Sequence, residues 1–173
     1  MARHGFMVVE TTNLHGSVCF SLQATKDIEN GAIVGKGELV TGETSIYNAL
    51  DDYSGDMYLV ANPAWVYESY KTTDKNEENY INKAGVTFKA YKLKKDMKFK
   101  VANIADGVDL AVGDFVEFTA DAYAKAAADT KLKVVAVEEL GFPFCIGSAG
   151  TLNGDYGYAI GEVTKKYTIE VVG

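Results

Sequence analysis

The chain has few of the residues on which most enzyme chemistry depends. Its 173 residues include a single arginine, Arg3, and two histidines, His4 and His15. The histidines do not form an H-x-x-x-H pair, and the sequence has no G-x-S-x-G segment to present a serine nucleophile. We therefore expect a protein that is not an enzyme. Because catalytic triads need not be local in sequence, a small hydrolase on a β scaffold stays open as the weakest hypothesis.

Cysteine is equally scarce. Cys19 and Cys145 are both flanked by apolar residues, which is typical of free cysteines that are buried as small hydrophobes. There is no C-x-x-C and no Cys/His ligand spacing, which argues against a zinc site. The acidic segment DDYSGD at 51–56 departs from the EF-hand pattern, and we interpret it as a solvated turn. We predict no metal site and no cofactor.

Positive charge and long apolar runs are also lacking. The net charge is −7, whereas a protein that binds phosphates needs an excess of Lys and Arg. The lysine cluster at 92–100 alternates with apolar residues, as the solvated face of a strand does. No run approaches the ~18 apolar residues that cross a bilayer, and we identify no signal peptide. We expect no nucleic acid and no membrane as partner, and a protein used inside a cell or in a particle assembled there.

One glycine-rich segment, ENGAIVGKGELVTGE at 29–43, raises the question of a phosphate-binding loop. Such a loop needs G-x-x-x-x-G-K-[ST] between a strand and a helix. Here three residues rather than four separate the first two glycines, and a glycine follows Lys36 where a hydroxyl is required. The residues that follow are β-branched and strand-like. The segment predicts a turn at Asn30, a strand, and a second turn near Gly42.

What the chain does have is repeated alternation of apolar and polar residues, the pattern of half-buried strands. Asn-Gly, Asp-Gly and Lys-Lys-Asp segments, all typical of turns, separate these runs. The predicted strands cover residues 17–25, 32–40, 56–62, 86–93, 97–104, 114–120, 131–140, 156–163 and 167–173. Many short strands between turns predict an all-β fold, a mainly antiparallel sandwich or barrel.

Two segments interrupt the strand pattern, so we expect one or two short helices within the all-β fold. The segment PAWVYESY at 63–70 begins with a proline that suits a first helical turn. The segment ADAYAKAAAD at 120–129 has the strongest helix propensity in the chain. Because it lies between two predicted strands, a helix of one or two turns and an elaborated hairpin loop fit it equally well.

A polar segment at 71–85 predicts a long surface loop. It divides the chain into an N-terminal β segment, 1–70, with the option of an extended arm, and a C-terminal β domain, 86–173. Whether the two parts form one compact domain is left open at this point, because hydrophobic patterning does not show which strands share a sheet.

Several segments in a fixed order suggest a family. They are DIENGAIVGKGELVTGETSIYNAL, DMYLVANPAWVYESY, NYINKAGVTFKAYKLKKDMKFKVAN, LAVGDFVEF and YAIGEVTKKYTIEVV. A strand enters ENG, an N-x-A-G motif precedes a strand with a following KKD turn, and a closing hairpin ends on a valine-rich strand. Over 27–173 the chain resembles capsid decoration (cement) proteins, which are small structural proteins of tailed bacteriophages and prophages.

This resemblance implies a non-enzymatic virion protein that is assembled in the bacterial host cytoplasm. It would bind the outer surface of the capsid through the major capsid protein and stabilise the head, with a homo-oligomer on the capsid lattice as an option. Interface cores favour aromatic residues, Met and Arg. The candidate interface residues are Arg3, His4, Phe6, Met7, Trp65 and Tyr67.

The N-terminal candidates leave two alternatives. They form either an arm added to a neighbour's sheet edge or the first strand of this chain's own core. The alternative function is a carbohydrate- or cell-surface-binding β module of a phage fibre or tail. That function predicts Trp65 and several of the 11 tyrosines together in an exposed groove. Aromatic residues in β proteins are more often core residues or cross-strand pairs.

Overall fold

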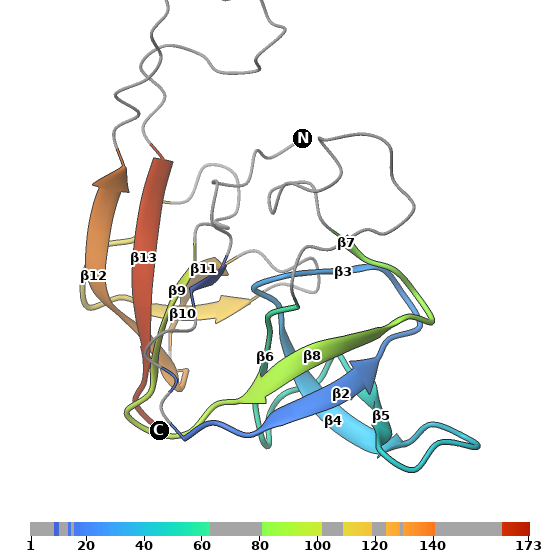
Figure 1. Ribbon diagram of the computed structural model, residues 1–173. Helices are drawn as coiled ribbons and strands as arrows, with labels where there is room; N and C mark the ends of the chain where they lie inside the picture. Colours follow the sequence, from blue (N-terminus) through green and yellow to red (C-terminus); the bar gives the residue numbers. More distant parts are fainter. Residues whose placement is uncertain are drawn as a thin grey trace, which may run out of the picture.

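The computed structural model describes residues 9–10, 14, 16–62, 81–101, 109–118, 124–128, 130–140 and 164–173. Every regular element in these ranges is a β-strand (Figure 1). The strands are β1 (Val9–Glu10), β2 (Cys19–Gln23), β3 (Ile28–Glu29), β4 (Ile33–Leu39), β5 (Ile46–Leu50), β6 (Tyr58–Val60), β7 (Ile81–Asn82), β8 (Thr87–Lys92), β9 (Lys98–Val101), β10 (Phe115–Phe118), β11 (Ala124–Ala127), β12 (Leu132–Leu140) and β13 (Thr164–Val171). The predicted all-β fold is confirmed.

Five strands close into a barrel in the order β2-β5-β4-β6-β8. The β2–β5 contact is parallel, and the other four contacts are antiparallel. Strand β8 follows the polar segment 71–85 in the sequence, yet it completes the barrel by pairing with both β2 and β6. Strands from both sides of that segment therefore build the barrel, which lies at the lower right of Figure 1.

The second layer is an antiparallel six-stranded sheet in the order β1-β9-β13-β12-β10-β11. The C-terminal strand β13 lies inside this sheet, between β9 and β12. Strands β12 and β13 pair from Leu132 with Val171 to Leu140 with Thr164, with an irregularity near Val134. This long pair stands upright and extends beyond the other strands (Figure 1). Strands β3 and β7 form a separate two-stranded ladder.

Two clusters of buried side chains form the core, and one of them joins the barrel to the sheet. The larger one joins Ile33 and Leu59 of the barrel to Phe99 and Ile169 of the sheet. The smaller one fills the barrel and includes Val34 beside Ile33 on the same strand. Alternation along β4 thus sends one side chain toward the sheet and the next into the barrel. A wall buried on both faces explains why this part of the strand is apolar without interruption.

The glycine-rich segment forms the predicted turn, strand and turn. Gly31 and Gly42 adopt φ values of 93° and 88°, in the left-handed region that glycine enters without a steric penalty, and β4 lies between them. The strand β5 follows the second turn, so the segment has no helix N-terminus at which a phosphate could bind.

The helix alternative for residues 120–129 is wrong over the part that the structure describes. Residues Ala124–Ala127 form strand β11, which pairs with all four residues of β10. The hydrogen bonds of this hairpin outweigh the helix propensity of alanine, which amounts to less than ~1 kcal/mol per residue. Residues 63–70 and the predicted strand at 156–163 lie outside the described residues.

Candidate functional site

The predicted interface residues lie outside the described part of the chain. They are Arg3, His4, Phe6, Met7, Trp65 and Tyr67. These residues lie in two segments, 1–8 and 63–80, and the described structure shows the residues next to each segment. Strand β1 pairs Val9 with Val101, so Val9 belongs to the chain's own sheet. The second segment begins directly after Asn62 and ends before β7.

Open sheet edges are the first candidate surface. The barrel is closed and has no edge, whereas the six-stranded sheet ends in β1 and β11. Within the described residues each of these strands has a neighbouring strand on one side only. Unpaired backbone groups at a sheet edge can bind an added strand from another chain. The two edges are therefore where this fold can extend its sheet with a partner.

A buried asparagine network supports the base of the segment 63–80. The side chain of Asn30 donates to the carbonyl of Asn62 at 2.8 Å and accepts from the Asn62 N–H at 3.0 Å. The Nδ2 of Asn82 donates to Asn30 Oδ1 at 3.1 Å and to the Ile28 carbonyl at 3.0 Å. Asn30 and Asn82 are each 3% exposed. The network therefore holds the two residues near this segment, Asn62 before it and Asn82 after it, close to β3.

The N-x-A-G motif supplies one of these asparagines and the turn after it. Asp27 accepts hydrogen bonds from the Lys83 ammonium and from the Ala84 N–H, both at 2.9 Å. These contacts lower the pKa of Asp27, the Lys83 hydrogen bond most and the Ala84 hydrogen bond next. Gly85 has a φ of 74°. The motif thus forms a tight turn between β7 and β8, and its spacing alone did not reveal that Asn82 is buried.

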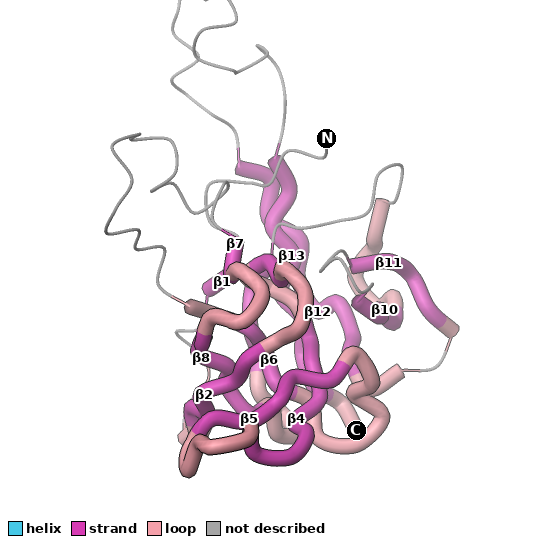
Figure 2. Tube along the Cα trace, turned by 90° about the vertical axis from the view of Figure 1, so that its right-hand side faces the viewer, coloured by secondary structure: helices cyan, strands magenta, loops and turns pink. Residues whose placement is uncertain are grey.

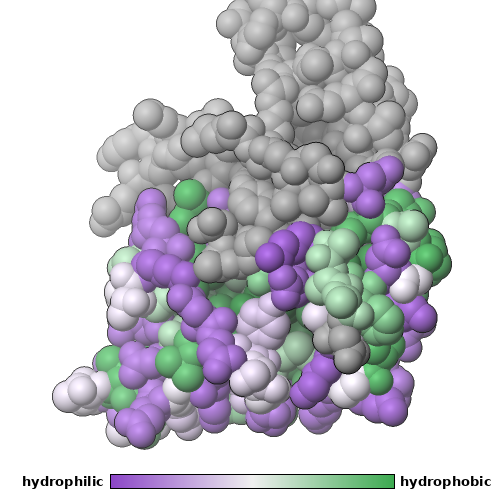
Figure 3. Space-filling model, turned by 180° about the vertical axis from the view of Figure 1, so that it is seen from behind, coloured by the Kyte–Doolittle hydropathy of each residue, from purple (hydrophilic) through white to green (hydrophobic). Residues whose placement is uncertain are grey.

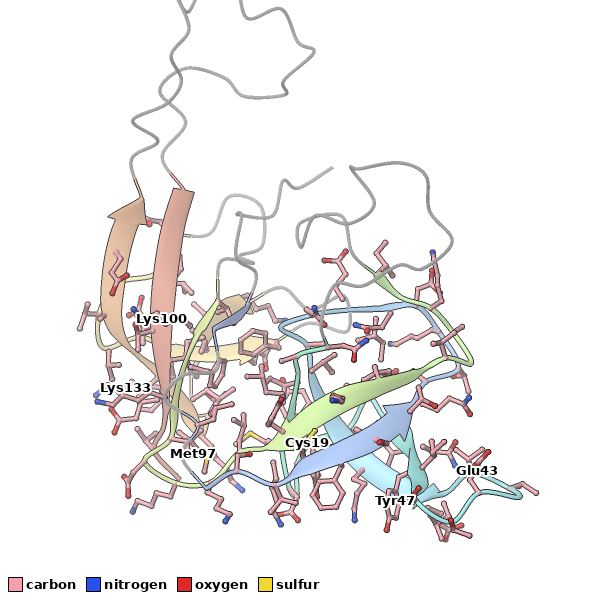
Figure 4. All side chains as sticks on the ribbon, viewed as in Figure 1. Cys19, Glu43, Tyr47, Met97, Lys100 and Lys133 are labelled. Atoms are coloured by element: carbon pink, nitrogen blue, oxygen red, sulfur yellow. The ribbon has the colours of Figure 1, made fainter. Side chains whose placement is uncertain are left out.

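An aromatic cluster closes one end of the barrel. The Lys36 ammonium lies over the rings of Phe20 and Tyr47, 4.7 and 4.2 Å from their centroids. Phe20 packs edge-to-face against Tyr58, with ring centroids 5.4 Å apart. Lys36 pairs with Ala49, which packs on the barrel core, so position 36 faces inward at the rim. Figure 4 labels Tyr47 at this rim. Lys36 therefore makes cation–π contacts within the fold.

A shallow pocket of about 300 Å³ lies beside Lys36. It is lined by Gly35, Lys36, Leu50, Asp52, Gly55, Asp56 and Tyr58. A hydrogen bond from Lys92 is the largest cause that lowers the pKa of Asp56, and the backbone N–H of Ser54 is the largest for Asp52. Both carboxyl groups are therefore ionised at neutral pH. A carboxylate held in its ionised form is a poor general acid.

The exposed face of the sheet carries cross-strand ion pairs. Lys98 lies 3.8 Å from Glu170, and Lys100 lies 2.9 Å from Glu138. Phe99 between these lysines is buried. The prediction that residues 92–100 form the solvated face of one strand holds only for Lys98 and Lys100 on β9, because Lys92 ends β8 and residues 93–97 form the connection between the two strands. Figure 4 shows Lys100 on this face.

The burial expected of Cys19 is wrong, because the structure places this cysteine on the exposed side of β2. Leu22 is fully buried in the barrel and Phe20 packs against the same core. Alternation along the strand therefore turns Cys19 outward. Cys145 lies outside the described residues. Among the described residues, no group of three or more His, Cys, Asp or Glu side chains is placed to hold a metal ion. The described part also has no helix long and apolar enough to cross a membrane.

Comparison with known proteins finds no matching family model, no matching curated protein and no matching solved structure. The features that bear on function are the two sheet edges, the supported base of the segment 63–80 and the aromatic rim of the barrel.

Proposed function

We propose that this chain is a non-enzymatic structural protein of a virion. It binds the outer surface of the capsid as a decoration (cement) protein and stabilises the head. The observation that carries the proposal is the position of β1. This strand directly follows residues 1–8, and it pairs with β9 alone among the described strands. An arm that precedes an edge strand can reach a neighbour's sheet without rearranging the fold.

The composition of this arm and the charge of the chain support the same function. Arg3, Phe6 and Met7 are residue types that interface cores favour. The net charge of −7 makes particles coated with the protein repel one another and stay in solution. The barrel and the sheet share one buried cluster, so the arm is attached to a rigid body.

The test is binding to capsids that were assembled without the protein. We expect saturable cosedimentation on a density gradient, at a fixed ratio to the major capsid protein. We also expect the coated capsids to withstand a higher temperature before they break. No binding at micromolar protein would overturn the proposal.

Two variants test the arm within this experiment. Phe6→Asp and Met7→Asp each place a charge in the proposed contact, and we expect both to lose capsid binding. Val112→Asp is the matched control, because Val112 is 63% exposed on the turn before β10, far from β1 in sequence. We expect this control to bind as the wild type does. Equal loss in all three variants would contradict a specific role for the arm.

A carbohydrate- or cell-surface-binding module is the second candidate. The half-buried rings of Phe20 and Tyr47 beside the polar pocket favour it, because sugars stack on aromatic rings next to hydrogen-bonding groups. Lys36 already contacts both rings, which weighs against this candidate. If capsid binding fails, glycan and cell-wall binding is the next test, with Tyr47→Ala as the loss-of-binding variant for this site and Trp65→Ala as the variant for the segment outside the described residues.

A further inference from the structure

Strand β11 forms the outer edge of the sheet beyond β10. The two strands pair over four positions, from Phe115 with Ala127 to Phe118 with Ala124. Figure 2 shows β11 at the margin of the described part of the molecule. In the view from behind, apolar surface gathers on the side of the molecule where this sheet lies (Figure 3). The side of β11 away from β10 has no neighbouring strand among the described residues, so the direction of its backbone N–H and carbonyl groups decides whether another strand can pair there.

The hydrogen bonds of β10 determine which way the backbone groups of β11 point. The carbonyl of Val116 accepts from the Thr130 hydroxyl at 2.6 Å. The N–H and carbonyl of Phe118 both bond to the Tyr53 hydroxyl. The Asp114 carbonyl accepts from Val134 of β12. Residues 114, 116 and 118 therefore direct their backbone groups away from β11.

In an antiparallel ladder, opposed residues either exchange hydrogen bonds or both point away from each other. Glu117 and Phe115 bond toward β11, to Lys125 and Ala127 respectively. Ala126 lies opposite Val116, so its N–H and carbonyl point outward to the free edge. No described residue is a hydrogen-bond partner of these two groups. The edge thus offers a donor and an acceptor in the geometry of a strand.

Lysine on an edge strand usually blocks the approach of another strand. Here the Lys125 ammonium lies 2.8 Å from Glu117 on the neighbouring β10. The side chain is therefore drawn inward across the hairpin, away from the free edge. The ion pair also leaves this part of the edge locally neutral on a chain of net charge −7. Ala126 itself is small and exposed, so it does not obstruct a second strand.

We propose that β11 pairs antiparallel with β11 of a second copy of this chain, about a two-fold axis at Ala126. In this register Ala126 exchanges hydrogen bonds with the partner's Ala126, and Lys125 lies opposite the partner's Ala127. No like charges are directly opposed, whereas an axis at Lys125 would place two ammonium groups face to face. Two six-stranded sheets join into one continuous sheet, and the shared edge is no longer open.

The first experiment is sedimentation velocity of the full chain over a wide concentration range. We expect a reversible shift to twice the mass of the chain, and an Ala126 amide whose hydrogen exchange slows as concentration rises. In Ala126→Pro the outward N–H is lost without breaking a bond to β10, and proline is tolerated on edge strands. We expect its dimer to be weaker by about tenfold or more, with the melting temperature retained.

Ala126→Ser is the matched control, because it keeps both backbone groups, and we expect it to dimerise as the wild type does. Ala127→Pro removes an N–H that bonds to β10, so it should lower the melting temperature and show that inward and outward positions differ. A wild-type chain that stays monomeric at every concentration overturns the proposal. A dimer that forms equally well in Ala126→Pro also overturns the proposal. This holds even if Phe6→Asp abolishes that dimer. Because these measurements use the protein alone, their outcome is independent of capsid binding.

Discussion

The hydroxyl of Tyr53 takes the place of a strand residue beside Phe118. It accepts a hydrogen bond from the Phe118 N–H at 3.1 Å and donates one to the Phe118 carbonyl at 3.0 Å. Tyr53 lies in the connection between β5 and β6 of the barrel, whereas Phe118 ends β10 of the sheet. The Tyr53 hydroxyl therefore provides hydrogen-bond partners for the N–H and carbonyl of Phe118, beyond the point where β10 pairs with β12. This contact also links the barrel to the sheet.

Replacing Tyr53 by phenylalanine leaves two backbone groups of β10 without a partner. We expect Tyr53→Phe to lower the free energy of unfolding by about 1–3 kcal/mol, measured by urea denaturation. Tyr47→Phe is the matched control, because Tyr47 contributes its ring face to Lys36 and its hydroxyl has no partner among the described residues. We expect a change below about 0.5 kcal/mol for that control. An equal loss in the two variants would remove the special role of Tyr53.

Alkaline pH should destabilise the protein through one buried tyrosine, Tyr58, and two half-buried ones, Tyr53 and Tyr91. Burial is the largest cause that raises the pKa values of Tyr53, Tyr58 and Tyr91 above the ordinary value of 10.0. A tyrosine whose folded pKa is raised adds stability that is complete below the unfolded pKa and is lost as pH rises through the folded pKa. We expect the melting temperature to fall above pH 10, and phenolate absorbance at 295 nm to rise late, together with unfolding. Free ionisation of all tyrosines near pH 10 without unfolding would contradict this.

The asparagine network should be costly to break. In Asn82→Ala the carbonyl of Ile28 and the side-chain oxygen of Asn30 both lose a donor in a buried place. We expect the free energy of unfolding to fall by about 1–3 kcal/mol, because a hydrogen bond lost by a buried polar group is costly, although Asn30 Oδ1 keeps its bond from the Asn62 N–H. Asn48→Ala is the control, since Asn48 donates one solvent-exposed hydrogen bond to Glu38 at 3.1 Å. If Asn48→Ala lowers the free energy of unfolding as much as Asn82→Ala does, burial of the hydrogen bonds is not the reason for the effect at Asn82.

Gly35 is expected to tolerate no side chain. A Cβ built at Gly35 would overlap the backbone oxygen of Asp52, which lies in the connection between β5 and β6. A Cβ at Gly55, in that same connection, would meet nothing within 4 Å. We expect Gly35→Ala to destabilise the fold by about 1–3 kcal/mol or more, as overpacking does. Gly55→Ala should be neutral or stabilising by up to ~1 kcal/mol. Thermal unfolding of the two variants side by side checks the contrast.

The sequence was informative where strands are bounded by turn-forming residues. The run between Asn30 and Gly42 shows this, because its glycines mark both turns and its apolar residues identify the strand. Strand β5 was missed because its residues are only half-buried and its partner β2 is distant in the sequence. At the alanines of β11 a helix was among the alternatives because alanine has a high helix propensity, whereas the structure has a strand there. Local propensity does not include the pairing of this segment with β10.

The arrangement of strands in sheets was beyond the sequence for a related reason. Alternation shows that a segment has one apolar face but not which strands are its neighbours. The barrel depends on the pairing of β2 with β8, and the sheet depends on the pairing of β9 with β13. Lys36 illustrates the same limit at a single residue, because only the closed barrel brings Phe20 and Tyr47 under its ammonium.

The order of the strands in the sequence determines when each layer can form during synthesis. The fifth strand of the barrel, β8, ends at Lys92, so the first 62 residues supply four strands but cannot close the ring. Strand β13 follows both β9 and β12 in the sequence, so this layer has a gap between β9 and β12 until β13 has been synthesised. A nascent chain must therefore avoid aggregation with open strand edges until β13 has been made, because both layers are completed by strands far apart in the sequence.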